Sequence, residues 1–191
     1  MSRALFISSR PIYPIIGGDQ IRTEQQLEFL SKKFEVDVVF LSNVREPETE
    51  SYFKFAKSVH FFYRSKLKCL LGTTKFLFNR LPLQVNYYYD RSLQRFIESV
   101  VDKYDLVFCN NIRTAEFVRT LKGPKRVIDF VDAISMNYDK ARKYSSGIKK
   151  IIYEIDFRRC KSYELNVLNR FDGCSIISEV DKKYIESCQT S

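Results

Sequence analysis

Short apolar runs alternate with longer amphipathic segments along the whole chain. The first run covers residues 4–8 (ALFIS), and the next covers residues 36–41, with a segment of helical periodicity at 19–33 between them. Further runs lie at 59–63, 106–109, 126–130 and 173–177. Nearly continuous apolar runs of this length are typical of strands buried on both faces of a parallel sheet. The alternation predicts an α/β fold with a doubly wound, Rossmann-like parallel sheet.

The segments between these runs predict the helices. In the helix at 19–33 we expect Ile21, Leu27, Leu30 and Phe34 to face inward. Further helices are expected at 46–57, 66–78, 92–103, 114–121 and 148–170, in a helical region opened by 131–138, and after Ser178. A chain of 191 residues is of ordinary size for one α/β domain, so we expect residues 1–191 to form a single domain.

Two adjacent glycines precede the first predicted helix. The first N–H groups of a helix have no internal partner and carry positive potential, and glycine lets a phosphate approach the backbone. Gly17 and Gly18 are therefore candidates for a contact with a nucleotide phosphate, and Arg22, one turn on, could meet the same anion. Asp19 is either part of that site or simply the cap of the helix. The pattern is neither G-x-G-x-x-G nor a P-loop, and a glycine pair also suits a plain turn.

Polar residues follow several predicted strands, and ligands of doubly wound sheets bind beyond the carboxyl ends of the strands. The candidates for a cleft at that edge are Tyr13, Asn110, Arg113, Ser135, Ser178 and Glu179. Asp129 and Asp132 lie at the end of the fifth strand and just beyond it. Because residues three apart on a strand point to opposite faces, Asp132 is the better placed to reach a ligand, and Asp129 the better placed to support it. Asp132 could alternatively cap the helix that follows.

The net charge of +9 is concentrated, since no Asp or Glu occurs from Ser51 to Tyr89. Lysines and arginines alternate there with leucine and aromatic residues, as expected for a surface that meets an anionic membrane. A solvated basic face with its apolar side in the core explains the same pattern. We expect no nucleic-acid partner, because no binding motif accompanies the charge.

The remaining composition limits the chemistry. His60 is the only histidine and lies in a predicted strand, so no Ser-His-Asp arrangement is expected. The 5 cysteines are widely spaced without C-x-x-C, which favours a reducing cytoplasm and neither a zinc site nor disulfides. We expect no metal and no bound cofactor. No run of 18 apolar residues and no signal peptide occurs, so the predicted location is cytoplasmic, with possible attachment to the inner face of the membrane.

Three separated motifs carry a resemblance to a known family. They are PIYPIIGGDQIRT, VIDFVDAIS and FDGCSIISEVD, in that order. Together they resemble the N-terminal domain of family 4 retaining glycosyltransferases with the GT-B fold, and are especially similar to bacterial sugar transferases of exopolysaccharide type. The resemblance implies transfer of a sugar from a nucleotide-sugar donor, bound as substrate, to a glycan or lipid-linked acceptor.

The resemblance also implies roles for particular residues. Gly17 and Gly18 would lie against the donor diphosphate or the reacting sugar. Asp132 would stand where many relatives carry an active-site histidine, with Asp129 behind it, and these two are the catalytic candidates. Relatives continue with a second Rossmann-like domain that binds the nucleotide, so we expect residues 1–191 alone to bind nucleotide sugar weakly and to transfer little sugar. A partner could instead cover the surface that the second domain would occupy.

Other functions remain compatible with the residues. The main alternative is a stand-alone Rossmann-like module that binds a nucleotide or a partner without transferase activity. A dehydrogenase fits less well, because the second strand ends in Leu41-Ser42 rather than an acidic residue for the ribose.

Overall fold

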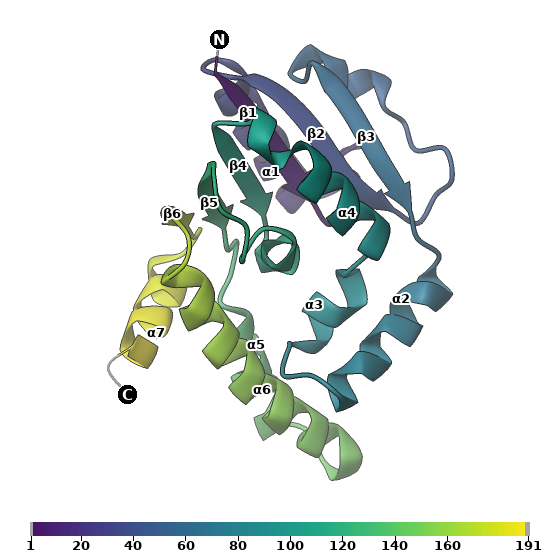
Figure 1. Ribbon diagram of the computed structural model, residues 1–191. Coiled ribbons are helices and arrows are strands. Elements are labelled where there is room, and N and C mark those ends of the chain that lie inside the picture. Colours follow the sequence, from purple (N-terminus) through teal and green to yellow (C-terminus); the bar gives the residue numbers. More distant parts are fainter. Residues whose placement is uncertain (1, 190–191) are drawn as a thin grey trace.

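The computed structural model describes residues 2–189 and contains one six-stranded parallel sheet in the order β3-β2-β1-β4-β5-β6 (Figure 1). The strands are β1 Arg3–Ser8, β2 Glu35–Ser42, β3 Ser58–Tyr63, β4 Leu106–Asn110, β5 Lys125–Asp129 and β6 Gly173–Ser175. Every neighbouring pair is parallel. The predicted doubly wound sheet is confirmed, and each strand lies where an apolar run predicted it.

Helices connect the strands: α1 Gly18–Ser31, α2 Lys66–Thr73, α3 Leu83–Tyr88, α4 Arg91–Val100, α5 Ile134–Lys143, α6 Gly147–Leu168 and α7 Glu179–Gln189. Short 3-10 helices add η1 Glu50–Lys54, η2 Thr74–Leu77, η3 Val101–Lys103 and η4 Ile112–Phe117. The α-helices expected at 46–57 and 114–121 are thus only 3-10 turns. The sequence analysis missed α3, whose six residues are too few to show a helical period.

Strand β1 divides the core between the two faces of the sheet. Leu5 and Ile7 belong to the cluster on one face, which includes residues of α4, α6 and α7, whereas Ala4 and Phe6 belong to the cluster that includes residues of α1. Successive side chains of a strand point to opposite faces, so one short run anchors both cores. These four side chains are fully buried, which explains why β1 has no polar residue between Arg3 and Ser8.

Helix α1 departs from its predicted inward face. Leu27 and Leu30 are buried as expected, but Ile21 is 48% exposed and Thr23 is buried instead. The first turns of α1 lie at the carboxyl ends of the strands, where Thr23 Oγ1 accepts a hydrogen bond from Asn110 Nδ2 at 3.1 Å. This part of the helix packs against polar strand ends rather than the apolar core, which the periodicity alone does not show.

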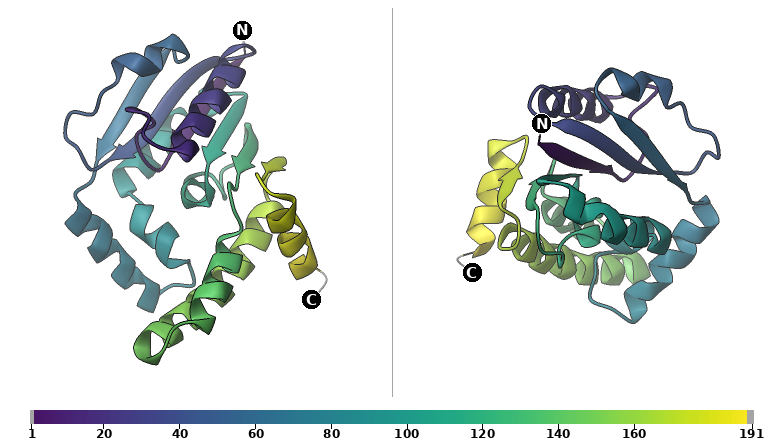
Figure 2. Two further views of the ribbon diagram at one scale, coloured as in Figure 1. Left: turned by 180° about the vertical axis from the view of Figure 1, so that it is seen from behind. Right: turned by 45° about the horizontal axis from the view of Figure 1, so that its top comes forward.

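Helices α2, α3, α5 and α6 extend beyond the carboxyl edge of the sheet, and both further views show the same arrangement (Figures 1 and 2). Two long-range bonds join them: Leu83 N donates to Asp156 Oδ1 at 2.9 Å, and Arg159 Nη1 donates to the Phe76 carbonyl at 2.6 Å. These helices therefore form walls around the end of the sheet at which a ligand would bind.

Candidate functional site

A cavity of about 370 Å³ opens at the carboxyl edge of the sheet. The chain runs from β1 outward to β2 and β3, then returns to β4 on the other side of β1, so the strand order reverses there. Ligands of such sheets bind at this reversal. The lining residues come from the end of β4, from the segments after β1, β4, β5 and β6, and from helices α1 and α7: Ser9, Arg10, Asp19, Thr23, Asn110, Asn111, Arg113, Val131, Asp132, Ile177, Ser178 and Asp181.

Two lining residues have unusual backbone conformations. Asn111 has φ 75° and Val131 has φ 68°, at the ends of the adjacent strands β4 and β5. Positive φ is unfavourable for a β-branched residue, and such conformations cluster at functional sites. Backbone bonds hold both turns, because Asn111 N donates to the Asp129 carbonyl at 2.9 Å and Ile177 N donates to the Val131 carbonyl at 3.2 Å. The two strand ends are thus bent sharply where they meet the cavity.

Asp132 follows directly after Val131 and lines the cavity. Its side chain is half-buried, and its Oδ2 accepts a hydrogen bond from Asn137 Nδ2 at 2.6 Å. Among the described residues no hydrogen bond is recorded to Oδ1, so this oxygen is able to accept a bond from a substrate hydroxyl. Asp132 thus lies at the cavity, and its contact with a ligand stays a prediction.

Asp129 is fully buried and does not line the cavity. It accepts bonds from Arg22 Nε at 2.8 Å, Arg22 Nη2 at 2.9 Å, Gln26 Nε2 at 2.6 Å and Ser175 Oγ at 2.7 Å. Burial raises the pKa of Asp129, but the bonds from Arg22, Gln26 and Ser175 outweigh it and hold the pKa below its ordinary value. Asp129 therefore binds neighbouring side chains behind the cavity, and a catalytic role for it stays a prediction.

The ion pair between Arg22 and Asp129 contradicts the expected position of Arg22 at an anion. Its guanidinium is engaged with Asp129 and does not line the cavity, so it is not placed to meet a phosphate. Gly17 caps α1 and, like Gly18, does not line the cavity, although a Cβ on Gly18 would meet nothing within 4 Å. Asp19 lines the cavity and forms an ion pair with Arg10. Contact between the glycine pair and a phosphate stays a prediction.

Three other predicted residues line the cavity, and each forms hydrogen bonds with other groups of the protein. Asn110 Nδ2 donates to Thr23 and to Gln26, the latter at 3.2 Å. Arg113 Nε donates to Gln84 at 2.8 Å. Ser178 Oγ accepts from the backbone at the start of α7. Their positions are therefore fixed before any ligand binds.

Tyr13, Glu179 and Ser135 do not line the cavity. The Tyr13 hydroxyl donates to Glu24 at 2.7 Å and its ring packs edge-on against Tyr52, so this side chain belongs to the core behind α1. Glu179 is exposed at the start of α7. Ser135 is fully buried, because the helix that follows the strand turns it inward, away from the edge at which the loop ends.

Ser135 binds the carboxylate of Glu164 beneath the site. Its N–H donates to Glu164 Oε1 at 3.0 Å and its hydroxyl donates to Glu164 Oε2. Burial raises the pKa of Glu164 to about 7, although the bonds from Ser135 act in the opposite direction. This buried pair fixes α5 to α6 next to the Asp132 turn.

The lining residues that sequence reasoning missed include Ser9, Arg10, Thr23 and Asp181. Ser9 and Arg10 could have been found, because they directly follow the first strand at the same edge as the other candidates. Thr23 and Asp181 lie on helices, and nothing in their local sequence shows which way they face. No group of three metal-binding side chains occurs in residues 2–189, and no helix in that range is long and apolar enough to span a membrane.

Comparison with known proteins identifies the fold. No family model and no curated protein sequence matches the chain. Sucrose-phosphate synthase from Thermosynechococcus elongatus matches with a TM-score of 0.60 at 13% identity, covering 98% of this chain and 45% of that one. The fold is glycosyltransferase-like. UGT2 from Phytolacca americana, solved with UDP-2-fluoro-glucose and pterostilbene, matches with a TM-score of 0.48 at 11% identity, over 95% of this chain and 49% of that one.

The chain thus spans about half the length of these glycosyltransferases. In the sucrose-phosphate synthase match nearly the whole chain is used, so the similarity covers the complete sheet and its helices. At such low sequence identity the structural similarity establishes the fold alone, because one fold supports many different chemistries.

Replacement of Asp129 by alanine should lower the free energy of unfolding by about 2–3 kcal/mol, because it leaves the Arg22 charge without its partner. Chemical denaturation measures this. The difference should shrink as the pH falls through the depressed pKa of Asp129, where the wild-type carboxylate also loses its charge. The matched control is Glu35→Ala, which breaks the exposed Lys57–Glu35 pair and should lower the free energy of unfolding much less, because water screens an exposed ion pair. Equal losses would contradict the supporting role of Asp129.

Glu164→Gln should change the pH dependence of stability. A folded-state pKa raised from 4.5 to about 7 means that the folded protein binds the proton more tightly, so wild-type stability falls as the pH rises through this range. Relative to the variant, the wild type should lose about 3 kcal/mol over that interval. Denaturation at a series of pH values tests this, with exposed Glu179→Gln as control. If the free energies of unfolding of wild type and Glu164→Gln changed with pH in parallel, the raised pKa of Glu164 would be excluded.

Proposed function

We propose that the chain is the acceptor-side lobe of a glycosyltransferase that moves a sugar from a nucleotide-sugar donor to a glycan or lipid-linked acceptor. The observation that carries the proposal is the cavity at the strand-order reversal, in a fold shared with sucrose-phosphate synthase. Sugar transfer needs an acceptor hydroxyl held in place and a polar group to bind it. Asp132 supplies that group in this proposal, and Asp129 supports the strand end from which it projects.

The alternation of charges around the cavity supports this role. Asp19 and Asp132 are carboxylates, Arg10 and Arg113 are cations, and all four come from different segments. A carboxylate accepts bonds from sugar hydroxyls, and an arginine donates to phosphate oxygens. In the proposal the acceptor hydroxyl lies at Asp132, while donor phosphate, held mainly by a second lobe, approaches Arg10 and the start of α1.

A complementation experiment tests this function. Labelled nucleotide sugars are supplied to extracts of source cells with and without the gene for this chain, so that any second lobe is present. We expect one labelled glycan to disappear on deletion and to return with the wild-type gene. Asp132→Ala should reduce its formation about a hundredfold or more, as is common for loss of a positioned acid–base group.

The control variant is Asp102→Asn, which removes an exposed carboxylate outside the cavity and should restore the glycan fully. An unchanged glycan profile after deletion would contradict sugar transfer. Full activity of Asp132→Ala would leave the transferase assignment intact but remove Asp132 from the site.

We also propose that one end of the molecule attaches to an anionic membrane surface. The stretch Ser51–Tyr89 does not act as a unit, because Tyr52, Arg64, Cys69 and Phe76 are buried. Its exposed apolar side chains gather on α2, on η2 and just beyond: Leu67, Leu70, Leu71, Leu77 and Phe78, the last 89% exposed. Exposed Lys66, Lys68, Lys75 and Arg80 lie among them.

The outer end of α6 enlarges this surface. Ile148, Ile151, Ile152 and Ile155 are exposed there beside Lys149 and Lys150. Arg159 joins α6 to η2 through its bond to Phe76 and lies 3.8 Å from the centre of the Phe76 ring. Figures 1 and 2 place the end of α2 next to this end of α6. Sequence reasoning missed the α6 contribution, because a long basic helix does not reveal its neighbours.

Vesicle co-sedimentation tests membrane attachment. The chain should bind vesicles rich in phosphatidylglycerol, and high salt should weaken this binding because it screens charge. The double variant Leu77→Gln and Phe78→Gln should lower binding at least about tenfold, since burial of each apolar side chain contributes about 1.5–3 kcal/mol. Phe29→Gln, on α1, is the control for loss of an exposed aromatic residue and should bind normally. Equal binding to neutral vesicles would contradict the electrostatic contribution.

A further inference from the structure

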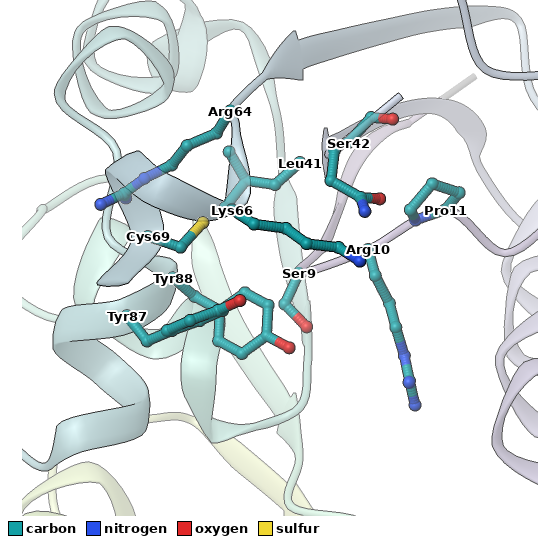
Figure 3. Close-up of a pocket in the computed structure, with 11 residues that line it drawn as sticks. Ser9, Arg10, Pro11, Leu41, Ser42, Arg64, Lys66, Cys69, Tyr87 and Tyr88 are labelled. Carbon is teal, nitrogen blue, oxygen red and sulfur yellow. The ribbon is translucent and has the colours of Figure 1, made fainter. Parts of the chain in front are cut away.

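A second cavity of about 190 Å³ adjoins the candidate site (Figure 3). Its walls come from the segment after β1, the ends of β2 and β3, and helices α2 and α3. Ser9 and Arg10 line both cavities, so the two spaces meet at the loop after β1. No role described above uses this second space.

The charged residues that line it are Arg10, Arg64 and Lys66, and no carboxylate is among the lining residues. Arg10 is neutralised by Asp19. Arg64 and Lys66 have no ion-pair partner within residues 2–189. The cavity therefore carries an excess of positive charge that the described part of the chain does not balance.

Arg64 shows this imbalance most clearly. The residue is 7% exposed, and Nη2 donates to the Lys68 carbonyl at 3.1 Å, but the buried Nη1 has no hydrogen-bond partner among the described residues. A Cβ on Gly72 would lie 2.5 Å from Nη2, so this glycine leaves the space that the guanidinium occupies under α2. A buried cation without a counter-charge is unfavourable, and a bound anion nearby would relieve it.

The other polar groups suit a sugar that carries the anion. In Figure 3 Lys66 extends from the start of α2 toward the segment that contains Arg10. The hydroxyl ends of Tyr87 and Tyr88 point from α3 toward the side on which Ser9 lies. Tyrosine offers an apolar ring face and a hydroxyl that donates or accepts, and an ammonium group binds phosphate or carboxylate oxygens through charge-assisted bonds.

We propose that this cavity is a subsite for an anionic acceptor: it binds a phosphate or carboxylate group of the acceptor near Lys66, while the buried charge of Arg64, whose guanidinium points away from Lys66 in Figure 3, adds positive potential from behind. The acceptor hydroxyl then reaches the first cavity past Ser9. The identity of the ligand as the acceptor rests on the proposed function, whereas the anion site rests on the cavity and on its lining cations, among which there is no carboxylate.

Binding measurements on the 191-residue chain test the subsite. Glucose 6-phosphate, glucuronate and glucose are titrated separately at about 0.15 M salt, where long-range charge effects are screened. Amide signals of Ser9, Arg10, Tyr87 and Tyr88 are followed by NMR. At least one anionic sugar should bind about tenfold more tightly than glucose and shift these signals, and the comparison of the two separates phosphate from carboxylate.

Lys66→Gln should weaken that binding about tenfold. Lys68→Gln is the matched control, because it removes the same charge from an exposed position of the same helix that does not line the cavity. Equal affinity for glucose, equal weakening by both variants, or no saturable shift of these signals would overturn the proposal. The readout is binding rather than transfer, so a failed complementation experiment with a positive titration would reject the transferase and keep the anion site.

Discussion

The buried contact between Asp129 and the side chains around it holds the end of the sheet together. Four hydrogen bonds reach this one carboxylate from α1 and from the end of β6, whereas Asp129 itself ends β5. A carboxylate in this position would be unfavourable without Arg22, and with it the three elements are fixed relative to one another. The turn through Val131 and Asp132 starts from this fixed point, so the position of Asp132 depends on a residue that does not line the cavity.

Much of the fold could be predicted from the sequence, and the reason is physical. The strands are apolar runs because both faces of a parallel sheet are covered, and this pattern is visible without coordinates. The short helix α3 and the 3-10 segment η4 were not predictable as such, because their few residues carry no period. Ile21 was misplaced for a related reason: periodicity describes one helix face, and the neighbours of that face at the strand ends are polar.

The sequence predicted that the candidate site lies at the carboxyl edge of the sheet, but it did not predict which side chains line the cavity. Strand order brings Asn110, Arg113, Asp132 and Ser178 together, as expected from their place after strands. Arg22, Asp129 and Ser135 are near the same edge, yet they bind protein groups. Sequence position shows that a polar residue follows a strand. It does not show whether the side chain pairs with Asp129 or Glu164 beneath the surface or faces the cavity. That depends on contacts distant in sequence, 107 residues apart for Arg22 with Asp129 and 29 for Ser135 with Glu164.

The two adjoining cavities also explain the uneven charge of the chain. The acid-free stretch Ser51–Tyr89 supplies an exposed basic and apolar surface on α2 and η2, but Arg64 from the same stretch is buried on the inner side of α2. Positive charge therefore lies on both sides of α2: outward on Lys68 among exposed leucines, and inward on Arg64, which precedes the helix. If, as proposed, the acceptor is anionic and lipid-linked, α2 would contact both the membrane that holds the acceptor and the space that receives its charged group. The outer side of α2 carries the apolar residues, whereas Gly72 leaves room for the Arg64 guanidinium on the inner side, so the two proposed contacts depend on different residues of one short segment.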